Sequence, residues 1–470
     1  MKLALFAGLV LVAGSALADT AYVGATLIDG TGGEAIQDGT LIVSGDGLTY
    51  VGPTAAAPLA TVSEQIDVSG KFITPGFIDT HIHFMESSRI HMDKSVQALD
   101  SSLTEADDIA WMKERLGYTL ERYVCSGVTT VVSLGGPVHI EMAGRATAMQ
   151  MERAPRVLLA GGPISNSGLE WIFDGKPAVF AADTEDDMRA LVRDFHEKGY
   201  DAIKLGFLGA EMGVDTEFTP VDYVPVLKAA ADEAHGFGMP VLTHVMTAEA
   251  FEAVADSGLD AFAHITFDVP ISAAAVDKVV EKRIKVAPTI AVFPKMIEVY
   301  DRSLELSDIE KACGDPQVFA TYFDYPEESW QNALRFQMLS GLYSLMIGGA
   351  QEAIEDSVRR LYAAGAEFII GSDAAHVGTP HGVALHIEMQ MLENAGLPPA
   401  TLIKAATHNA AEALGKLDEF GTLSTGKSAD FLVLEKDPLE TIRNAQYIET
   451  VVVAGRAIPH ALLHVAEEDR

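Results

Sequence analysis

The stretch TPGFIDTHIH, residues 74–83, is an apolar run that ends in two histidines one residue apart. In a β-strand, side chains at positions i and i+2 point to the same face of the sheet. His81 and His83 would therefore present two imidazoles side by side at the end of a buried strand. Because neutral imidazole binds zinc and similar transition metals, the pair predicts half of a metal site.

Downstream of this strand, short apolar runs alternate with segments of helical periodicity as far as residue 415. The expected strands are residues 77–83, 128–134, 156–161, 200–206, 240–245, 261–265, 285–292 and 367–373. Expected helices include residues 184–198, 221–237, 248–257 and 274–282. Near-continuous apolar strands are typical of parallel sheets with helices on both faces. Eight such units predict an α/β fold, a (β/α)8 TIM barrel over residues 73–415, with its active site at the carboxyl ends of the strands.

One connection in this region is much longer than an ordinary loop between a strand and a helix. It runs from residue 293 to residue 366, and residues 330–364 within it are strongly helical in pattern. We expect a helical insertion over about residues 293–366 that serves as a lid or as an oligomer contact. The sequence therefore leaves open whether the protein forms a homo-oligomer.

Both ends of the chain are rich in short β-type runs separated by glycine turns, at residues 21–52 and 429–455. This texture is typical of small antiparallel sheets. Since one or two hairpins alone are only marginally stable, residues 19–72 and 416–470 are expected to fold together into one small β-sandwich.

The first residues have the pattern of a secretory signal peptide. Lys2 precedes an apolar run over residues 3–12, and Ala16 and Ala18 fit a cleavage site before Asp19. The alternative, a membrane anchor, is disfavoured because the run is too short to cross about 30 Å of hydrocarbon. We expect a signal peptide at residues 1–18 and an exported, periplasmic protein with no membrane insertion after cleavage.

The composition excludes some classes of partner. The chain has 33 basic and 67 acidic residues and a formal charge of −34, which argues against binding to nucleic acid or to an anionic membrane. Its two cysteines are too few for a disulfide framework. Cys125, in a helical stretch just before a strand, has the pattern of a small buried residue, and a bridge to Cys313 stays open.

Four further residues with ligand chemistry stand at the ends of other expected strands. They are Lys204, His244, His264 and Asp373. Each alone has a simpler explanation, such as a core histidine, an ion-paired lysine or a helix-capping aspartate. Charged groups so close to an apolar core are costly unless they are paired or bound to a metal. Together with the two histidines of the first strand they predict a metal site at the mouth of the barrel.

Several motifs carry a resemblance to a known family. They are PGFIDTHIH at residues 75–83, SGVTTV at 126–131, AATHNAAEALG at 405–415 and GTL at 421–423, with GK and ADF at 426–431. With them the chain resembles the amidohydrolase superfamily, and within it the imidazolonepropionase-related metal-dependent hydrolases. That group includes enzymes with a carboxylated lysine that act on Xaa-Pro or N-acyl dipeptides.

The resemblance implies a binuclear centre with two divalent ions, zinc by preference. Lys204 would carry a CO2-derived carbamate that bridges the ions. One ion would be held by His81, His83 and Asp373, and the other by His244 and His264. A metal-bridging hydroxide would attack the substrate carbonyl while Asp373 transfers the proton.

The expected function is therefore hydrolysis of amide or other C–N bonds in a small molecule. Candidate substrates are an N-acyl amino acid, a cyclic amide or an Xaa-Pro-type dipeptide. Alternatives are a mononuclear deaminase, which would normally lack Lys204, and a lactone or phosphotriester hydrolase on the same scaffold. A non-catalytic homologue would have lost ligands. Loop residues near the expected mouth are candidate substrate contacts, namely His139, Asn166 and His376.

Overall fold

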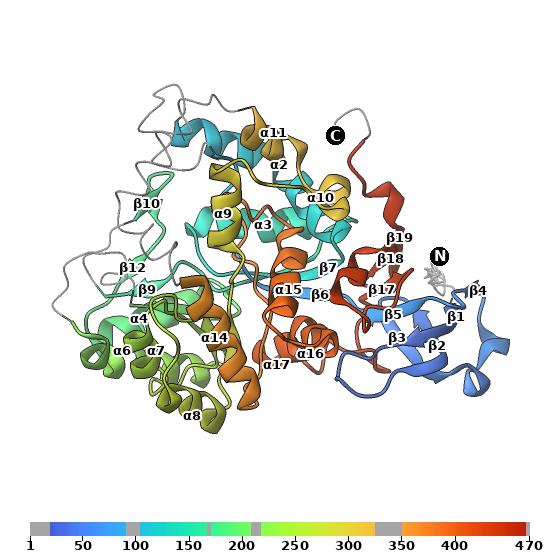
Figure 1. Cartoon of the computed structure of the whole chain (residues 1–470), viewed down its shortest axis with the longest axis horizontal. Helices are drawn as coiled ribbons and strands as arrows, with labels where there is room; N and C mark the ends of the chain where they lie inside the picture. Colours follow the sequence, from blue (N-terminus) through green and yellow to red (C-terminus); the bar gives the residue numbers. More distant parts are fainter. Residues whose placement is uncertain (1–18, 91–103, 167–170, 208–217, 325–349, 467–470) are drawn as a thin grey trace, which may run out of the picture.

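The computed structural model describes residues 19–90, 104–166, 171–207, 218–324 and 350–466 (Figure 1). The expected signal peptide, residues 1–18, lies outside the described residues. No helix in the described ranges combines the length and the apolar composition that a membrane span requires.

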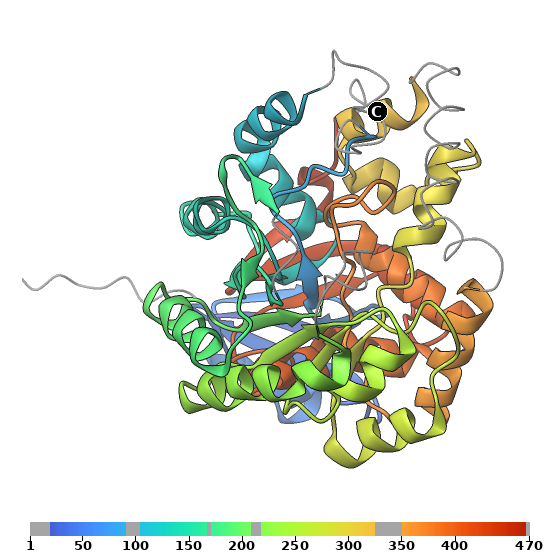
Figure 2. The same ribbon diagram turned by 90° about the vertical axis from the view of Figure 1, so that its left-hand side faces the viewer.

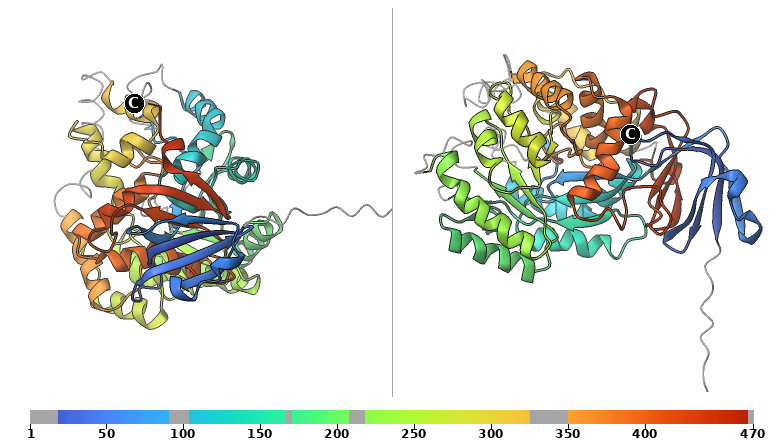
Figure 3. Two further views of the ribbon diagram at one scale, coloured as in Figure 1. Left: turned by 90° about the vertical axis from the view of Figure 1, so that its right-hand side faces the viewer. Right: turned by 90° about the horizontal axis from the view of Figure 1, so that it is seen from below.

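Strands from both ends of the chain form a single mixed sheet. Its N-terminal members are β1 (Thr20–Leu27), β2 (Ile36–Ser44), β3 (Gly47–Pro53), β4 (Glu64–Asp67) and β5 (Phe72–Pro75). Its C-terminal members are β17 (Phe431–Leu434), β18 (Ile448–Val453) and β19 (Arg456–Pro459). The strand order is β19-β18-β17-β5-β1-β2-β3, with β4 paired to β1, so β5 joins the two ends of the chain (Figure 3). The expected two-layered sandwich stays a prediction.

The middle of the chain forms two parallel sheets. One contains β6 (Phe77–Ile82), β7 (Val128–Ser133) and β8 (Arg156–Leu159). The other has the order β12-β9-β13-β14-β15-β16. Its strands are β9 (Ile164–Ser165), β12 (Phe180–Ala181), β13 (Ile203–Gly206), β14 (Val241–His244), β15 (Ala261–Ala263) and β16 (Lys285–Ala287). A separate hairpin pairs β10 (Ile172–Phe173) with β11 (Lys176–Pro177).

The segment expected as the eighth strand, residues 367–373, is not a regular strand. It makes two isolated bridges, from Phe368 to Val286 of β16 and from Ala374 to Ile82 of β6. This part of the chain therefore lies between the edge strands β16 and β6 of the two parallel sheets. On the other side, the amide of Ala202, just before β13, donates to the carbonyl of Leu159 in β8 (3.2 Å). The closed eight-stranded barrel stays a prediction.

Helices lie around these parallel strands (Figure 2). They are α2 (Glu105–Cys125), α3 (Val138–Ala148), α4 (Glu185–Glu197), α6 (Pro220–Gly236), α7 (Ala248–Val254), α8 (Ala273–Lys282), α15 (Ala384–Asn394), α16 (Pro399–Lys404) and α17 (Ala410–Ala413). The starts of α4 and α6 follow from local chemistry, because Thr184 and Thr219 each accept a hydrogen bond from a backbone amide of the first turn.

The described part of the insertion consists of α9 (Val292–Tyr300), α10 (Asp308–Cys313), α11 (Pro316–Phe323) and α14 (Ala350–Ala363). Residues 325–349 of the expected insertion lie outside the described residues. Helix α9 begins at Val292, within the span expected as the seventh strand. That strand ends at Ala287 and is correspondingly shorter than expected.

The insertion is attached to α2. Cys313 forms a disulfide with Cys125, with their Cα atoms 5.5 Å apart. Both cysteines are fully buried, which confirms the prediction that Cys125 is a buried residue. Their pairing, which the sequence left open, is also established. Arg115 of α2 also pairs with Asp315 at 2.8 Å. The C-terminal His460 packs on the disulfide, with its Nε2 3.4 Å from Cys313 Sγ.

Candidate metal centre

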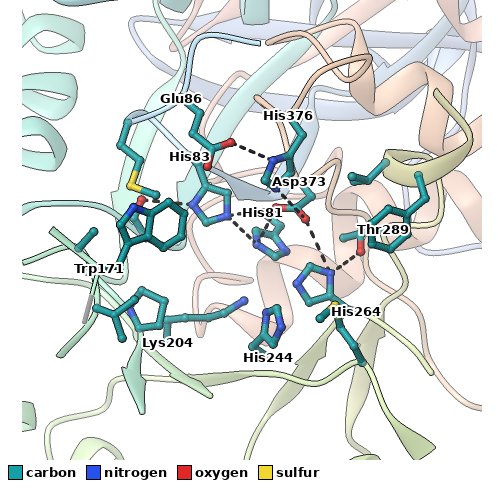
Figure 4. Close-up of a pocket in the computed structure, with 18 of the residues that line it drawn as sticks. His81, His83, Glu86, Trp171, Lys204, His244, His264, Thr289, Asp373 and His376 are labelled. Atoms are coloured by element: carbon teal, nitrogen blue, oxygen red, sulfur yellow. Dashed lines mark hydrogen bonds and ion pairs between the residues drawn. The ribbon is translucent and has the colours of Figure 1, made fainter. Parts of the chain in front are cut away.

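The six strand-end residues lie around one cavity of about 290 Å³. His81 lies on β6, Lys204 on β13 and His244 at the end of β14. His83 and His264 directly follow β6 and β15, and Asp373 lies between the isolated bridges at Phe368 and Ala374. Figure 4 shows the Lys204 side chain extending into the cavity, with the imidazole of His244 beside it. Neighbouring parallel strands thus bring together residues that are up to 292 positions apart in the sequence.

His81, His83 and Asp373 form the tightest group. The Nε2 atoms of the two histidines lie 3.2 Å from each other, and each is 3.1 Å from Asp373 Oδ1. The point equidistant from these three atoms lies about 1.8 Å from each of them. One ion could therefore bind all three at normal zinc–ligand distances of about 2.0–2.1 Å. Asp373 Oδ1 is buried and has no hydrogen-bond partner among the described residues. This group therefore fits a metal ion.

His264 and His244 form the second group, beside the first. Their ring centroids are 4.4 Å apart, and the ring of His264 lies 4.8 Å from that of His81. Lys204 is 1% exposed and lies in the wall between the two groups (Figure 4). The two groups are close enough for one bridging ligand to reach both.

The protonation states favour metal binding, which requires neutral imidazole and ionised carboxylate. Burial lowers the pKa of His81 well below its usual range and that of His264 to about 3. Burial raises the pKa of Asp373, but the neighbouring His81 and His376 together hold it well below its usual range. The donor atoms are therefore ready to bind a cation without first losing protons.

Hydrogen bonds outside the two groups set the orientation of the rings. His264 Nδ1 lies 2.6 Å from Thr289 Oγ1, whose own proton is donated to the Pro288 carbonyl. Nδ1 of His264 must then be the donor, which leaves the lone pair on Nε2. His83 Nδ1 likewise faces the Gly135 carbonyl at 3.2 Å. These contacts are of the kind that fixes the tautomer of metal-binding histidines.

The backbone is strained at the same positions. His264, Thr289 and Asp373 have φ values of 91°, 52° and 51°, in a region that non-glycine residues seldom adopt. Asp79 stabilises the Asp373 turn because its carboxylate accepts hydrogen bonds from the amide (2.9 Å) and the hydroxyl (2.5 Å) of Ser372. Strain of this kind concentrates at functional sites.

Sequence reasoning missed two polar side chains of the cavity that contact the candidate site residues, Glu86 and Thr289. Glu86 pairs with His376 Nδ1 at 2.9 Å, and Nε2 of the same ring lies 3.6 Å from Asp373 Oδ2. Burial lowers the pKa of His376, but Glu86 and Asp373 outweigh it and raise that pKa to about 10. Thr289 is the other residue. The strand-end rule that identified the histidines would have found it after β16.

Of the three expected substrate contacts, only His376 lines the cavity. His139 lies in the first turn of α3, which begins at Val138, and pairs with Asp174 at 2.6 Å; it is not among the described lining residues, and its contact with substrate stays a prediction. Asn166 is fully buried beside Ser165, whose hydroxyl donates to it at 3.1 Å. It is not among the residues that line the cavity.

Comparisons with known proteins agree with this geometry. The model of the amidohydrolase family matches residues 72–458. An imidazolonepropionase of Agrobacterium fabrum is 25% identical over 418 residues, covering 86% of each chain. Among solved structures, a Xaa-Pro dipeptidase (TM-score 0.68, 21% identity) covers 94% of this chain and 100% of its own. Molinate hydrolase (TM-score 0.70, 22% identity) covers 95% of each.

The family match covers most of the chain and includes all six candidate ligands that line the cavity. We conclude that the chain belongs to the amidohydrolase family and is a hydrolase that acts on carbon–nitrogen bonds.

Proposed function

We propose that the chain is a binuclear metal-dependent hydrolase, with the centre at the mouth of a (β/α)8 barrel formed by residues 73–415. The observation that carries the proposal is the convergence of all six candidate ligands on one cavity. His81, His83 and Asp373 would hold one divalent ion, and His244 and His264 the other. Zinc suits this set of nitrogen and oxygen donors.

Lys204 is proposed to carry a carbamate formed with CO2. An ammonium group buried among histidines that bind cations would repel those cations, whereas a carbamate offers two anionic oxygens to them. Its place in the wall between the two groups of ligands suits a bridging role. This residue also disfavours the alternative of a mononuclear deaminase. Hydrolysis of a lactone or a phosphotriester stays a second alternative on the same scaffold.

Bound divalent ions would polarise the substrate carbonyl and lower the pKa of a water molecule at the site. Asp373 accepts a proton from this water molecule as the water oxygen bonds to the substrate carbonyl carbon. The same carboxyl then returns the proton to the nitrogen as the C–N bond breaks. The products are a carboxylic acid and an amine. The candidate substrates are N-acyl amino acids, cyclic amides and Xaa-Pro-type dipeptides.

The number of metal ions per chain tests this proposal. Protein produced with zinc and bicarbonate should contain about two ions per chain, and the Lys204→Ala variant about one, because the bridging ligand is lost. Elemental analysis against protein concentration gives both numbers. One ion in the unmodified protein would favour the deaminase, and two ions in Lys204→Ala would contradict the carbamate.

The contact between Thr289 and His264 predicts a smaller effect. Thr289→Val removes the hydroxyl but keeps the shape, and should weaken metal binding by about 10- to 100-fold, as for other residues that orient metal ligands. Competition with a chromophoric chelator measures the change. Thr289→Ser keeps the hydroxyl and should bind metal as the unmodified protein does. Equal weakening in both variants would contradict the role of the hydroxyl.

We also propose that residues 1–18 direct export and that the mature protein works in the periplasm. The Cys125–Cys313 disulfide supports this location, since disulfides persist in oxidising compartments. Free thiols at both positions in protein taken directly from cells would contradict it.

A further inference from the structure

Much of the cavity wall is apolar. Ten of the twenty residues that line the cavity have apolar side chains. Phe267 and Phe293 meet edge to face with ring centroids 5.1 Å apart, and Trp171 and Met296 extend this wall. With a volume of about 290 Å³, the cavity lies at the small end of the range for ligand sites. It suits a compact group with little polar surface.

Apart from the proposed metal ligands, the described lining offers an anionic substrate no cation that is not already paired. Apart from the six proposed ligands, its ionisable members are Glu86 and His376, and these pair with each other at 2.9 Å. The other ring nitrogen of His376 faces Asp373 Oδ2 at 3.6 Å. Both nitrogens of this ring therefore already face carboxylate oxygens. No arginine is present among the described lining residues.

A substrate carboxylate on the apolar side of the molecule would be buried against this wall. A buried carboxylate without a partner is strongly disfavoured. The formal charge of −34 adds a long-range repulsion of anions that approach the site. An uncharged molecule meets none of these penalties.

We infer that this site is selective for uncharged amides and carbamates with a compact apolar group, and that it discriminates against analogues bearing a free carboxylate on that group. This inference rests on the proposed hydrolase function and narrows it. Of the three candidate substrate classes, N-acyl amino acids and Xaa-Pro-type dipeptides carry such a carboxylate, whereas a cyclic amide need not.

Three anilides of matched shape test the inference. Propananilide and its 4-carboxamide derivative are uncharged, and the 4-carboxylate derivative differs from the carboxamide in charge but hardly in size. The zinc-loaded enzyme should hydrolyse both uncharged compounds with a kcat/KM about tenfold or more above that of the carboxylate. An equal or higher value for the carboxylate would overturn the inference and leave the hydrolase proposal intact.

Cleavage of none of the three would count against the proposed function, and binding then decides the inference separately. Quenching of tryptophan fluorescence gives the Kd of each compound for the zinc-loaded protein. Tighter binding of the two uncharged compounds supports the inference. Equal or tighter binding of the carboxylate overturns it.

A variant can supply the cation that the wall lacks. Met296 lies on α9, lines the cavity and is partly exposed, so an arginine there can keep its charged end hydrated. Met296→Arg should raise kcat/KM for the 4-carboxylate relative to the 4-carboxamide by about tenfold. Met296→Gln, which is polar but neutral, is the matched control and should leave this ratio unchanged. An unchanged ratio in Met296→Arg would show that charge does not decide selectivity and would overturn the inference.

Discussion

Asp373→Asn is expected to lower kcat by about 10³- to 10⁴-fold, the upper range for loss of a group that transfers protons in catalysis. The amide cannot accept a proton from water, and its oxygen is a weaker metal ligand than a carboxylate oxygen. The loss should therefore appear in kcat on any substrate that the unmodified enzyme cleaves. Initial rates at saturating substrate measure it, and circular dichroism checks that the variant is folded.

Asp174→Asn is the matched control for this experiment. Asp174 is also an aspartate that contacts a histidine, at 2.6 Å, but it lies outside the cavity. Its amide variant should keep the activity of the unmodified enzyme. Activity within tenfold of normal in folded Asp373→Asn would remove this residue from the proposed chemistry, as would an equal loss in both variants.

Loss of the disulfide is expected to have the largest effect on stability. Cys125 and Cys313 are 188 residues apart, and closing a loop of that length restricts the unfolded chain by about 5 kcal/mol in the chain-entropy model. Reduction should lower the free energy of unfolding by about that amount. Urea unfolding of the oxidised and the reduced protein, followed by tryptophan fluorescence, measures the difference.

The double variant Cys125→Ala with Cys313→Ala separates the crosslink from the thiols. It should unfold at the urea concentration at which the reduced protein unfolds, and adding reductant should not change it further. Identical midpoints for the oxidised and the reduced protein would contradict a stabilising bridge. Two free thiols titrated in the unfolded, unreduced protein would show that no bridge forms.

The residues of the metal centre could be found from the sequence because each stands at the end of an apolar run. Burial on both faces makes such runs visible, and parallel strands bring their carboxyl ends together. Lys204 is an instance, since it is a charged residue within the short apolar strand β13 in the sequence and lines the cavity in the structure. For Lys204, the local sequence pattern was sufficient to predict its place in the cavity.

The failures have a common physical cause, which is a contact between residues far apart in the sequence. Beyond the end of the seventh strand, the carboxyl group of Glu388 accepts hydrogen bonds from the amides of Ile290 (3.0 Å) and Ala291 (2.9 Å), just before α9. These amides would otherwise have continued the ladder. Burial raises the pKa of Glu388 to about 8. Nothing near residue 290 in the sequence indicates this partner.

The eighth strand and the cysteine pair illustrate the same point. The carboxylate of Asp79 accepts hydrogen bonds from the amide and the hydroxyl of Ser372. These bonds hold the backbone in a turn, outside a regular ladder, just before Asp373. The bridge between Cys125 and Cys313 depends on how the insertion docks on α2. The two cysteines alone could not predict that docking.

The place of β5 in the mixed sheet has a consequence for how the chain is made. β5 pairs on one side with β1, already synthesised, and on the other with β17, whose first residue is Phe431. A nascent chain therefore carries an open sheet edge at β5 until β17 (Phe431–Leu434) has been synthesised. Open edges of this kind recruit other strands. Premature termination before β17 should accordingly yield chains that aggregate, which makes the synthesis of β17 the step that closes this edge of the sheet.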